Sequence, residues 1–220
     1  MTVTSNGPGT MNPSTKEFRS ALEAALAEFG IEELSASQIE QMNRHYSMMC
    51  RWNRHINLTR ITEAEEAARR HYAESLWGGR FIGDARSMVD IGSGAGFPGI
   101  PLAVLKTDIL ITAIEVNQKK ALFLSEVKDA LGLANFQVVN ARIEEFDWTS
   151  QDLLTSRALD RADEILTELA GQLRPPQRLM LYCASDLANR LTGNLAKGYQ
   201  LELHAIPQSE ARLVALYSPR

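Results

Sequence analysis

The chain has few of the features that mark membrane-spanning, secreted or nucleic-acid-coating proteins. Among its 220 residues are only two cysteines, Cys50 and Cys183, and no apolar run approaches the ~20 residues that span a bilayer. Its first residues show neither the basic start nor the apolar segment of a secretory signal. We therefore expect a cytoplasmic protein with no membrane contact, and we interpret both cysteines as small buried apolar residues rather than reactive thiols.

The chain also lacks an excess of positive charge, because 23 Lys and Arg residues stand against 27 Asp and Glu residues and the formal net charge is -4 at pH 7. This balance argues against a protein that coats nucleic acid through bulk charge. One segment departs from it: residues 44–86 hold eight arginines against five acidic residues. The sequence therefore predicts a local basic surface in an acidic protein.

Residues 1–14 contain almost no apolar side chains, so we predict a disordered tail. Apolar residues then recur at helical spacing, which predicts an N-terminal helical unit over residues 15–80. Its three predicted helices are 15–29 before Gly30, one opening at a Ser35–Gln38 capping box, and one from a Thr62–Glu65 box to about Trp77.

From residue 81 to 220, short β-branched runs alternate with helical runs, which predicts an α/β domain with a parallel sheet. The last two strands are joined only by "PQSE", too short for a parallel crossover, so they form an antiparallel pair. We expect six strands running the same way and one antiparallel strand at the edge. The predicted strands are 87–91, 109–116, 136–142, 152–158, 177–184, 199–206 and 211–218.

The stretch "VDIGSGAGFPGIPLAVL", residues 89–105, places four glycines between a strand and a helix. Glycines at the carboxyl end of a strand permit positive φ and let a ligand approach the main chain. An acidic residue, Glu115, ends the next predicted strand, where a carboxylate accepts hydrogen bonds from ribose hydroxyls. The residues alone leave two ligands open, a dinucleotide such as NAD and S-adenosylmethionine. Pro98 and Pro101 crowd the helix start that would meet a pyrophosphate, and the terminal hairpin favours S-adenosylmethionine.

Six segments in order resemble the GidB family, also called RsmG: "WNRHINLTRI", "RRHYAESL", "VDIGSGAGFPGIPLAVL", "EVNQKKALFL", "VVNARIEEF" and "SRAL". Members of that family are S-adenosylmethionine-dependent methyltransferases that make N7-methylguanosine in 16S ribosomal RNA of the small subunit. The resemblance implies a class I, Rossmann-like methyltransferase domain with a seven-stranded sheet. It also implies a partner, 16S rRNA or the small ribosomal subunit.

The resemblance also assigns residues to roles. Arg157 matches an arginine that faces the cofactor and target pocket, and we take it as the catalytic candidate. The cofactor-binding candidates are Asp90, Gly92, Gly94, Gly96, Phe97, Glu115, Ile143, Glu144 and Arg157.

The RNA-binding candidates come from the basic segment and from two lysines that open the helix after the second predicted strand. We expect them to lie beside the mouth of the pocket and to contact phosphates. The histidines lack a carboxylate or cysteine cluster at metal spacing, so no metal is expected. The candidates are Arg51, Arg54, Arg60, Arg69, Arg70, His71, Lys119 and Lys120.

Guanine N7 carries a lone pair and no proton, so its methylation needs no general base. The chain agrees with that chemistry, because it has Ser156-Arg157-Ala158 where amino-group methylases commonly have an Asn/Asp-Pro-Pro-aromatic loop. Neither cysteine lies at a pocket-facing turn, as a C5-type methylase requires.

Departures from the family pattern occur at Leu159, Asp160 and residues 181–186. They leave a catalytically inactive, cofactor-sensing ribosome-binding homologue as one alternative, and a small NAD-dependent oxidoreductase as another. We expect the protein to be a monomer.

Overall fold

The computed structural model describes residues 13–31, 34–157, 162–193 and 195–220. Most of the predicted tail, residues 1–12, and the departures at Leu159 and Asp160 lie outside this description. The first helix, α1 (Pro13–Glu28), begins two residues before its predicted start at residue 15. None of the described helices is long and apolar enough to cross a membrane.

The second predicted helix is confirmed as α2 (Ala36–Asn53), with the predicted capping box at its start. Ser35 N donates to Gln38 Oε1 at 2.9 Å, and Gln38 N donates to Ser35 Oγ at 3.3 Å. The third is one helical run in four parts: α3 (Ala64–Glu66), the π-helix η1 (Ala67–Ala73), α4 (Glu74–Gly78) and the 3-10 turn η2 (Gly79–Phe81). Its predicted Thr62 capping box is wrong, because Glu63 is the N-cap and makes no side-chain cap bond.

The remaining helical segments alternate with strands and close the two faces of one sheet. They are α5 (Gly99–Leu105), α6 (Gln118–Leu131), the 3-10 turn η3 (Ile143–Glu145), α7 (Ala162–Gln172) and α8 (Ser185–Thr192). The strands are β1 (Ser87–Ile91), β2 (Leu110–Ile114), β3 (Phe136–Val139), β4 (Leu153–Arg157), β5 (Arg178–Cys183), β6 (Tyr199–Ala205) and β7 (Leu213–Pro219).

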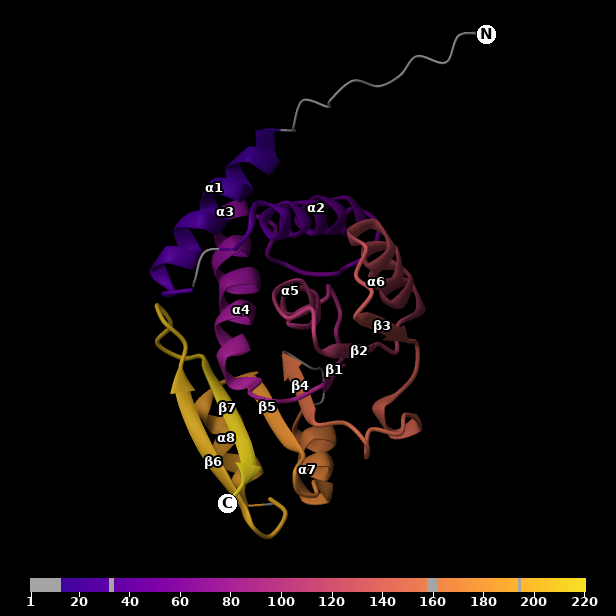
Figure 1. Ribbon diagram of the computed structural model, residues 1–220, viewed down its shortest axis with the longest axis vertical. Coiled ribbons are helices and arrows are strands. Elements are labelled where there is room, and N and C mark those ends of the chain that lie inside the picture. Colours follow the sequence, from indigo (N-terminus) through magenta and orange to yellow (C-terminus); the bar gives the residue numbers. More distant parts are fainter. Residues whose placement is uncertain (1–12, 32–33, 158–161, 194) are drawn as a thin grey trace, which may run out of the picture.

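The seven strands form one sheet in the order β3-β2-β1-β4-β5-β7-β6 (Figure 1). The antiparallel pairing of β6 with β7 is confirmed, and six strands run the same way. The expected edge position of the antiparallel strand is wrong, because β7 also pairs with β5 and β6 takes the edge. Burial explains the difference: the middle of β7 is buried, whereas β6 carries exposed polar residues such as Gln200 and Glu202 that an edge strand tolerates.

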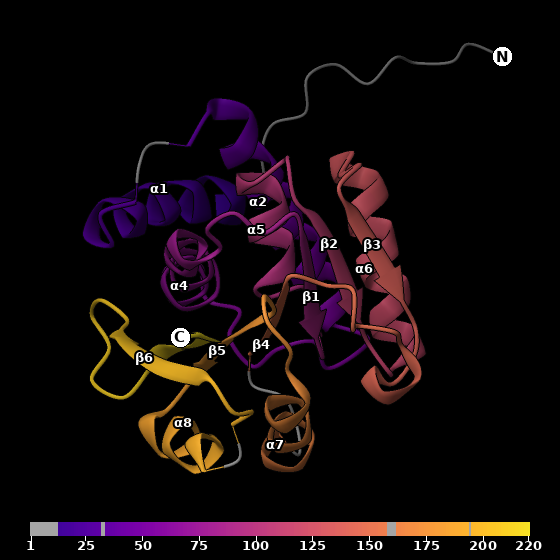
Figure 2. The same ribbon diagram turned by 60° about the horizontal axis from the view of Figure 1, so that its bottom comes forward.

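Successive residues of the strands enter cores on opposite faces of the sheet. On β1, Met88 packs into the core that contains α1, α2, α5 and α6, and Val89 packs with α7 and α8. Figure 2 shows α1, α2, α4 and α5 on one side of the sheet and α7 and α8 on the other. The predicted boundary near residue 80 therefore separates helices from sheet in sequence only, since the N-terminal helices share an apolar core with the sheet.

His45 connects these N-terminal helices to the glycine turn. It is fully buried on α2, and its Nε2 lies 2.9 Å from the carbonyl oxygen of Ala95. A carbonyl only accepts, so Nε2 carries the proton and Nδ1 accepts from the Tyr72 hydroxyl at 2.9 Å. Burial lowers the pKa of His45 to about 4, partly opposed by the bond to Ala95.

This burial predicts acid sensitivity. The folded-state pKa of His45 is below the unfolded value of 6.5, so the unfolded chain takes up a proton first as the pH falls. Between pH 7 and pH 5 the free energy of unfolding should drop by about 2 kcal/mol through this one group. His45→Gln keeps a hydrogen-bond donor and an acceptor but does not titrate. Its free energy of unfolding, measured with denaturant, should therefore fall by about 2 kcal/mol less than that of the wild type between pH 7 and pH 5. Replacement of the exposed His55 by Gln serves as the control, and equal pH dependence of His45→Gln and wild type would contradict the assignment.

Candidate functional site

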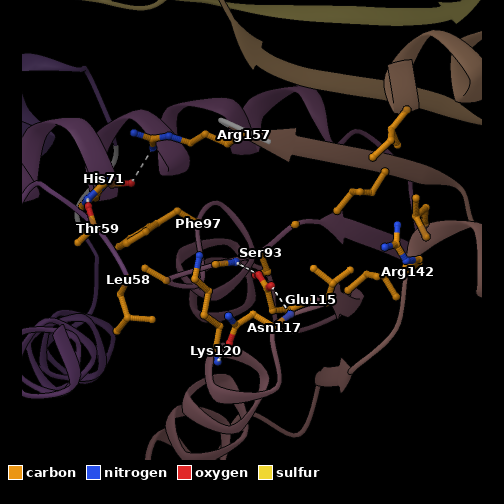
Figure 3. Close-up of a pocket in the computed structure, with 18 of the residues that line it drawn as sticks. Leu58, Thr59, His71, Ser93, Phe97, Glu115, Asn117, Lys120, Arg142 and Arg157 are labelled. Atoms are coloured by element: carbon orange, nitrogen blue, oxygen red, sulfur yellow. Dashed lines mark hydrogen bonds between the residues drawn. The ribbon is translucent and has the colours of Figure 1, made fainter. Parts of the chain in front are cut away.

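A pocket of about 540 Å³ opens at the carboxyl ends of β1, β2 and β4 (Figure 3). This is the position where open α/β sheets bind ligands. Thr59, His71 and Arg157 lie toward one end, Glu115 and Lys120 near the middle, and Arg142 toward the other end. Seven predicted cofactor residues line the pocket: Gly92, Gly94, Phe97, Glu115, Ile143, Glu144 and Arg157.

The glycine turn has the backbone that its sequence predicts. Gly92, Gly94 and Gly96 adopt φ values of 69°, 58° and 92°, a region that favours glycine. A Cβ at Gly94 would meet only the Gly92 carbonyl oxygen, at 3.7 Å, so the main chain there is open to a ligand. Gly96 differs, because a Cβ there would meet Ile100 in the core, and Gly96 does not line the pocket.

Asp90 lies beneath the turn and does not line the pocket either. Its Oδ2 accepts from Ser93 Oγ at 2.6 Å and from Gly99 N at 3.0 Å. Burial raises the pKa of Asp90 to about 6, while the bonds from Ser93 and Gly99 oppose that rise. Asp90 therefore shapes the turn that lines the pocket and is not itself exposed to the pocket.

Glu115 directly follows β2 at the pocket wall, and its carboxylate accepts hydrogen bonds from the main chain on both sides. Oε2 accepts from Gly94 N at 2.9 Å, and Oε1 accepts from Asn117 N at 2.8 Å. A carboxylate has about four acceptor positions, so each oxygen keeps capacity for a further donor. The geometry fits the two hydroxyls of a ribose placed over Gly94.

The start of α5 does not fit a dinucleotide. Gly99 N donates to Asp90, Ile100 N and Leu102 N donate to carbonyls one turn earlier, and Pro101 has no N–H. A pyrophosphate at a helix start needs free backbone donors. The first turn of this helix offers none, and the buried carboxyl group of Asp90 beside it disfavours an anion.

The end of the pocket farthest from Arg142 is built by the N-terminal helices. Asn53 holds the loop after α2, since its Oδ1 accepts from Leu58 N at 2.8 Å and its Nδ2 donates to the carbonyl of Thr59 at 2.9 Å. Thr59 Oγ1 lies 2.8 Å from His71 Nε2. The His71 ring stacks on Phe97 with a centroid separation of 4.4 Å and an interplanar angle of 15°.

His71 is neutral in this position. Burial, followed by the positive charge of Arg157, lowers the pKa of His71 to about 3. The imidazole therefore forms an uncharged, flat wall. Sequence reasoning placed His71 among RNA contacts and found no role for Leu58 or Thr59, whereas all three line the pocket.

Arg157 extends from the end of β4 toward the π-helix. Its Nη1 donates to the carbonyl of His71 and to Ser75 Oγ, both at 3.3 Å, and its Nη2 donates to the carbonyl of Arg70. Nη2 also lies 3.4 Å from Oε2 of the buried Glu74. The guanidinium group thus fastens the turn that carries His71 to the end of the sheet.

The structure divides the predicted RNA-binding residues between two places. Arg51, Arg54 and Arg60 are exposed at the end of α2 and in the loop after it. Lys119 and Lys120 begin α6, whose Glu126 accepts a bond from Trp52 Nε1 at 3.2 Å, which places α6 beside α2. Of these five, Lys120 lines the pocket.

Arg69 and Arg70 do not line this pocket. They line a second hollow, of about 590 Å³, with Glu28 and Glu66. Arg69 pairs with Glu28 at 3.3 Å and Arg70 pairs with Glu66 at 2.7 Å. Their neighbour His71 lines the first pocket instead.

The described residues include no group of three or more His, Cys, Asp or Glu side chains that fits a metal ion. Both cysteines are free and partly buried. Burial raises the pKa of Cys183 to about 11 and also raises the pKa of Cys50. Neither thiol therefore ionises readily near neutral pH, as a nucleophilic cysteine must.

Solved structures with the same fold include a ribosomal protein L11 methylase from Lactobacillus delbrueckii subsp. bulgaricus and an rRNA methylase from Streptococcus thermophilus. The first gives a TM-score of 0.53 at 15% identity, covering 69% of this chain and 79% of that one. The second gives 0.51 at 15% identity, covering 66% and 95%. At these identities the likeness establishes the fold alone.

Comparison of amino-acid sequences finds relatives of higher identity than these solved structures. Proteins named ribosomal RNA small subunit methyltransferase G match from Halorhodospira halophila, with 34% identity over 203 residues, and from Stenotrophomonas maltophilia, with 33% over 191 residues. These matches cover 90% and 86% of this chain, and 96% and 88% of the relatives. The family described as rRNA small subunit methyltransferase G matches residues 38–204, a range that includes the whole pocket. The chain therefore belongs to the rRNA small subunit methyltransferase G family.

Proposed function

We propose that this protein transfers a methyl group from S-adenosylmethionine to N7 of a guanine in 16S rRNA of the small ribosomal subunit. The observation that carries the proposal is a single pocket with two different parts. Glu115 offers a carboxylate beside the open glycine turn near the middle, and the stacked rings of His71 and Phe97 form an uncharged wall toward one end (Figure 3). The first arrangement suits a nucleoside of the cofactor, and the second suits a flat base.

S-adenosylmethionine supplies an electrophilic methyl group when it is bound. Glu115 and the main chain at Gly92 and Gly94 would hold the ribose and methionine parts, and Ile143 with Glu144 would flank the adenine. The chain's contribution to the rate is orientation of the two reactants, which supplies up to ~7 to 11 kcal/mol of barrier reduction in well-oriented systems.

The wall formed by His71 and Phe97 supports methylation at N7 rather than at an amino group. Methylation of an exocyclic amine requires loss of a proton, whereas N7 has a free lone pair. His71 has a pKa of about 3 and its Nε2 already bonds with Thr59, so it is a poor general base at neutral pH. The two alternatives gain no support: the start of α5 is closed to a pyrophosphate, and the relatives are methyltransferases by name.

The test is mass mapping of modified nucleosides in small-subunit rRNA from a deletion strain. The deletion should remove one N7-methylguanosine, and the purified protein with S-adenosylmethionine should restore it in vitro. An unchanged modification map would reject the proposal, and a methyl group on another atom would reject the N7 assignment. We also predict a monomeric, cytoplasmic protein, which size-exclusion chromatography and cell fractionation will check.

Loss of the Glu115 carboxylate should weaken cofactor binding. Glu115→Gln retains one acceptor but removes the charge, so calorimetry with S-adenosylmethionine should show about a 10- to 100-fold higher Kd. Asp129→Asn removes an exposed carboxylate on α6 and should leave the Kd unchanged. Unaltered affinity in a folded Glu115→Gln protein would contradict the ribose-binding role.

For RNA, we propose that the exposed cations at the end of α2 and the start of α6 contact phosphates. Arg54→Glu with Lys119→Glu should weaken rRNA binding and lower the salt slope by about 0.7 for each lost contact. Cofactor affinity should not change, because neither side chain lines the pocket. A charge-matched pair near the amino ends of β1 and β2, away from the pocket, is the control: Arg86→Glu with Lys106→Glu.

The same assay decides whether the RNA reaches the second hollow. If phosphates contact Arg69 and Arg70 as well, the pair Arg69→Glu with Arg70→Glu will also lower the slope. If neither the Arg54 and Lys119 pair nor the Arg69 and Arg70 pair changes affinity or salt dependence, the RNA-facing role of the N-terminal helices is wrong.

A further inference from the structure

Glu74 is a buried carboxylate that sequence analysis did not single out. It is 1% exposed at the first residue of α4, directly after the π-helix. Two arginines from distant parts of the chain face its two oxygens. Arg212 Nε and Nη2 lie 3.0 and 2.5 Å from Oε1, and Arg157 Nη2 lies 3.4 Å from Oε2.

The cluster of Glu74, Arg157 and Arg212 joins three elements around one charge. Arg157 ends β4 at the pocket wall, and Arg212 lies in the segment between β6 and β7. Arg212 grips Glu74 with two donors, so the carboxylate cannot rotate freely. Its second oxygen is thereby presented to Arg157.

Arg157 depends on this carboxylate for its place. Its other described partners, the carbonyls of Arg70 and His71 and the hydroxyl of Ser75, are neutral. Glu74 is the one acidic group among its described partners, and a buried guanidinium group without a counter-charge is costly. Removal of the Glu74 charge would favour side-chain conformations in which Arg157 turns toward water.

We propose that Glu74, held by Arg212, is a positioning residue that fixes Arg157 and, through it, the turn that carries His71 at the target end of the pocket. The inference rests on the proposed function, because its kinetic effect is on methyl transfer. Glu74 itself does not line the pocket and so acts only through Arg157.

The experiment is a double-mutant cycle on rRNA methylation, with kcat and KM measured for Arg157→Ala, Glu74→Gln and their combination. Each single variant should lower kcat at saturating rRNA by about 10-fold or more, with KM for rRNA changed by less than about 3-fold. In the Arg157→Ala background, Glu74→Gln should cause no further loss. Glu23→Gln, which breaks an exposed ion pair with Arg19 on α1, should change neither value.

A second double variant separates positioning from general stability. Glu74→Gln alone leaves two arginines without a counter-charge and should lower Tm by several °C, roughly as a buried unpaired charge does. Glu74→Gln with Arg212→Gln restores the original net charge of the cluster and should recover part of that Tm. Its kcat should stay low, because Arg157 still lacks the carboxylate; recovery of kcat along with Tm would overturn the positioning role.

A direct readout keeps the inference independent of the enzymatic assay. The ¹⁵N shifts of the His71 imidazole should change in Glu74→Gln and in Arg157→Ala, and the two changes should not add. If the wild type methylates rRNA but Glu74→Gln is fully active, the inference fails and the proposed function stands. If the wild type methylates nothing, the proposed function fails, and unchanged His71 shifts in Glu74→Gln would reject the inference as well.

Discussion

The burial of one carboxyl group, that of Asp90, constrains the whole site. Its Oδ2 accepts from both Ser93 and Gly99, so it ties the end of β1 to the start of α5 across the glycine turn. The fit leaves no room for another side chain, since a Cβ at Gly99 would lie 2.6 Å from that oxygen. Between Asp90 and Gly99 the chain passes through three glycines with positive φ, Gly92, Gly94 and Gly96.

Two further side chains hold the same turn from outside it. His45 of α2 donates to the carbonyl of Ala95, and Glu115 of β2 accepts from Gly94 N. The turn is thus gripped by groups from the N-terminal helices and from two strands. The helices that complete the pocket are for this reason part of one core with the sheet rather than an attached module.

Local patterns in the sequence were enough to predict much of this arrangement. The Ser35–Gln38 box gave the start of α2, and the short "PQSE" link required an antiparallel pair. The glycines after β1 and the acidic residue directly after β2 located the pocket, because each follows a predicted strand at the edge where such sheets bind ligands. Strand ends were less accurate, as with β3, which ends at Val139 rather than 142.

What the sequence did not predict depends on contacts between distant residues. The pairing of Glu74 with Arg212 spans 138 positions, and nothing near either residue signals it. The neutral state of His71 follows from burial against Phe97, which spacing does not reveal. Charge along the sequence also did not reveal that Arg69 and Arg70 pair with Glu28 and Glu66 around a second hollow, because Glu28 comes from a helix about 40 residues earlier.

The position of β7 between β5 and β6 has a consequence for biosynthesis. Edge strand β6 pairs only with β7, although β7 is made about eight residues later. While the chain is still being translated, β5 therefore presents an unpaired edge and β6 has no partner. Strand β7 is complete only when residue 219 has left the ribosome, and Arg212, the partner of Glu74, lies directly before that strand. Nascent protein must pass through this open state each time it is made, which makes the β5 edge the site where interrupted synthesis would lead to aggregation.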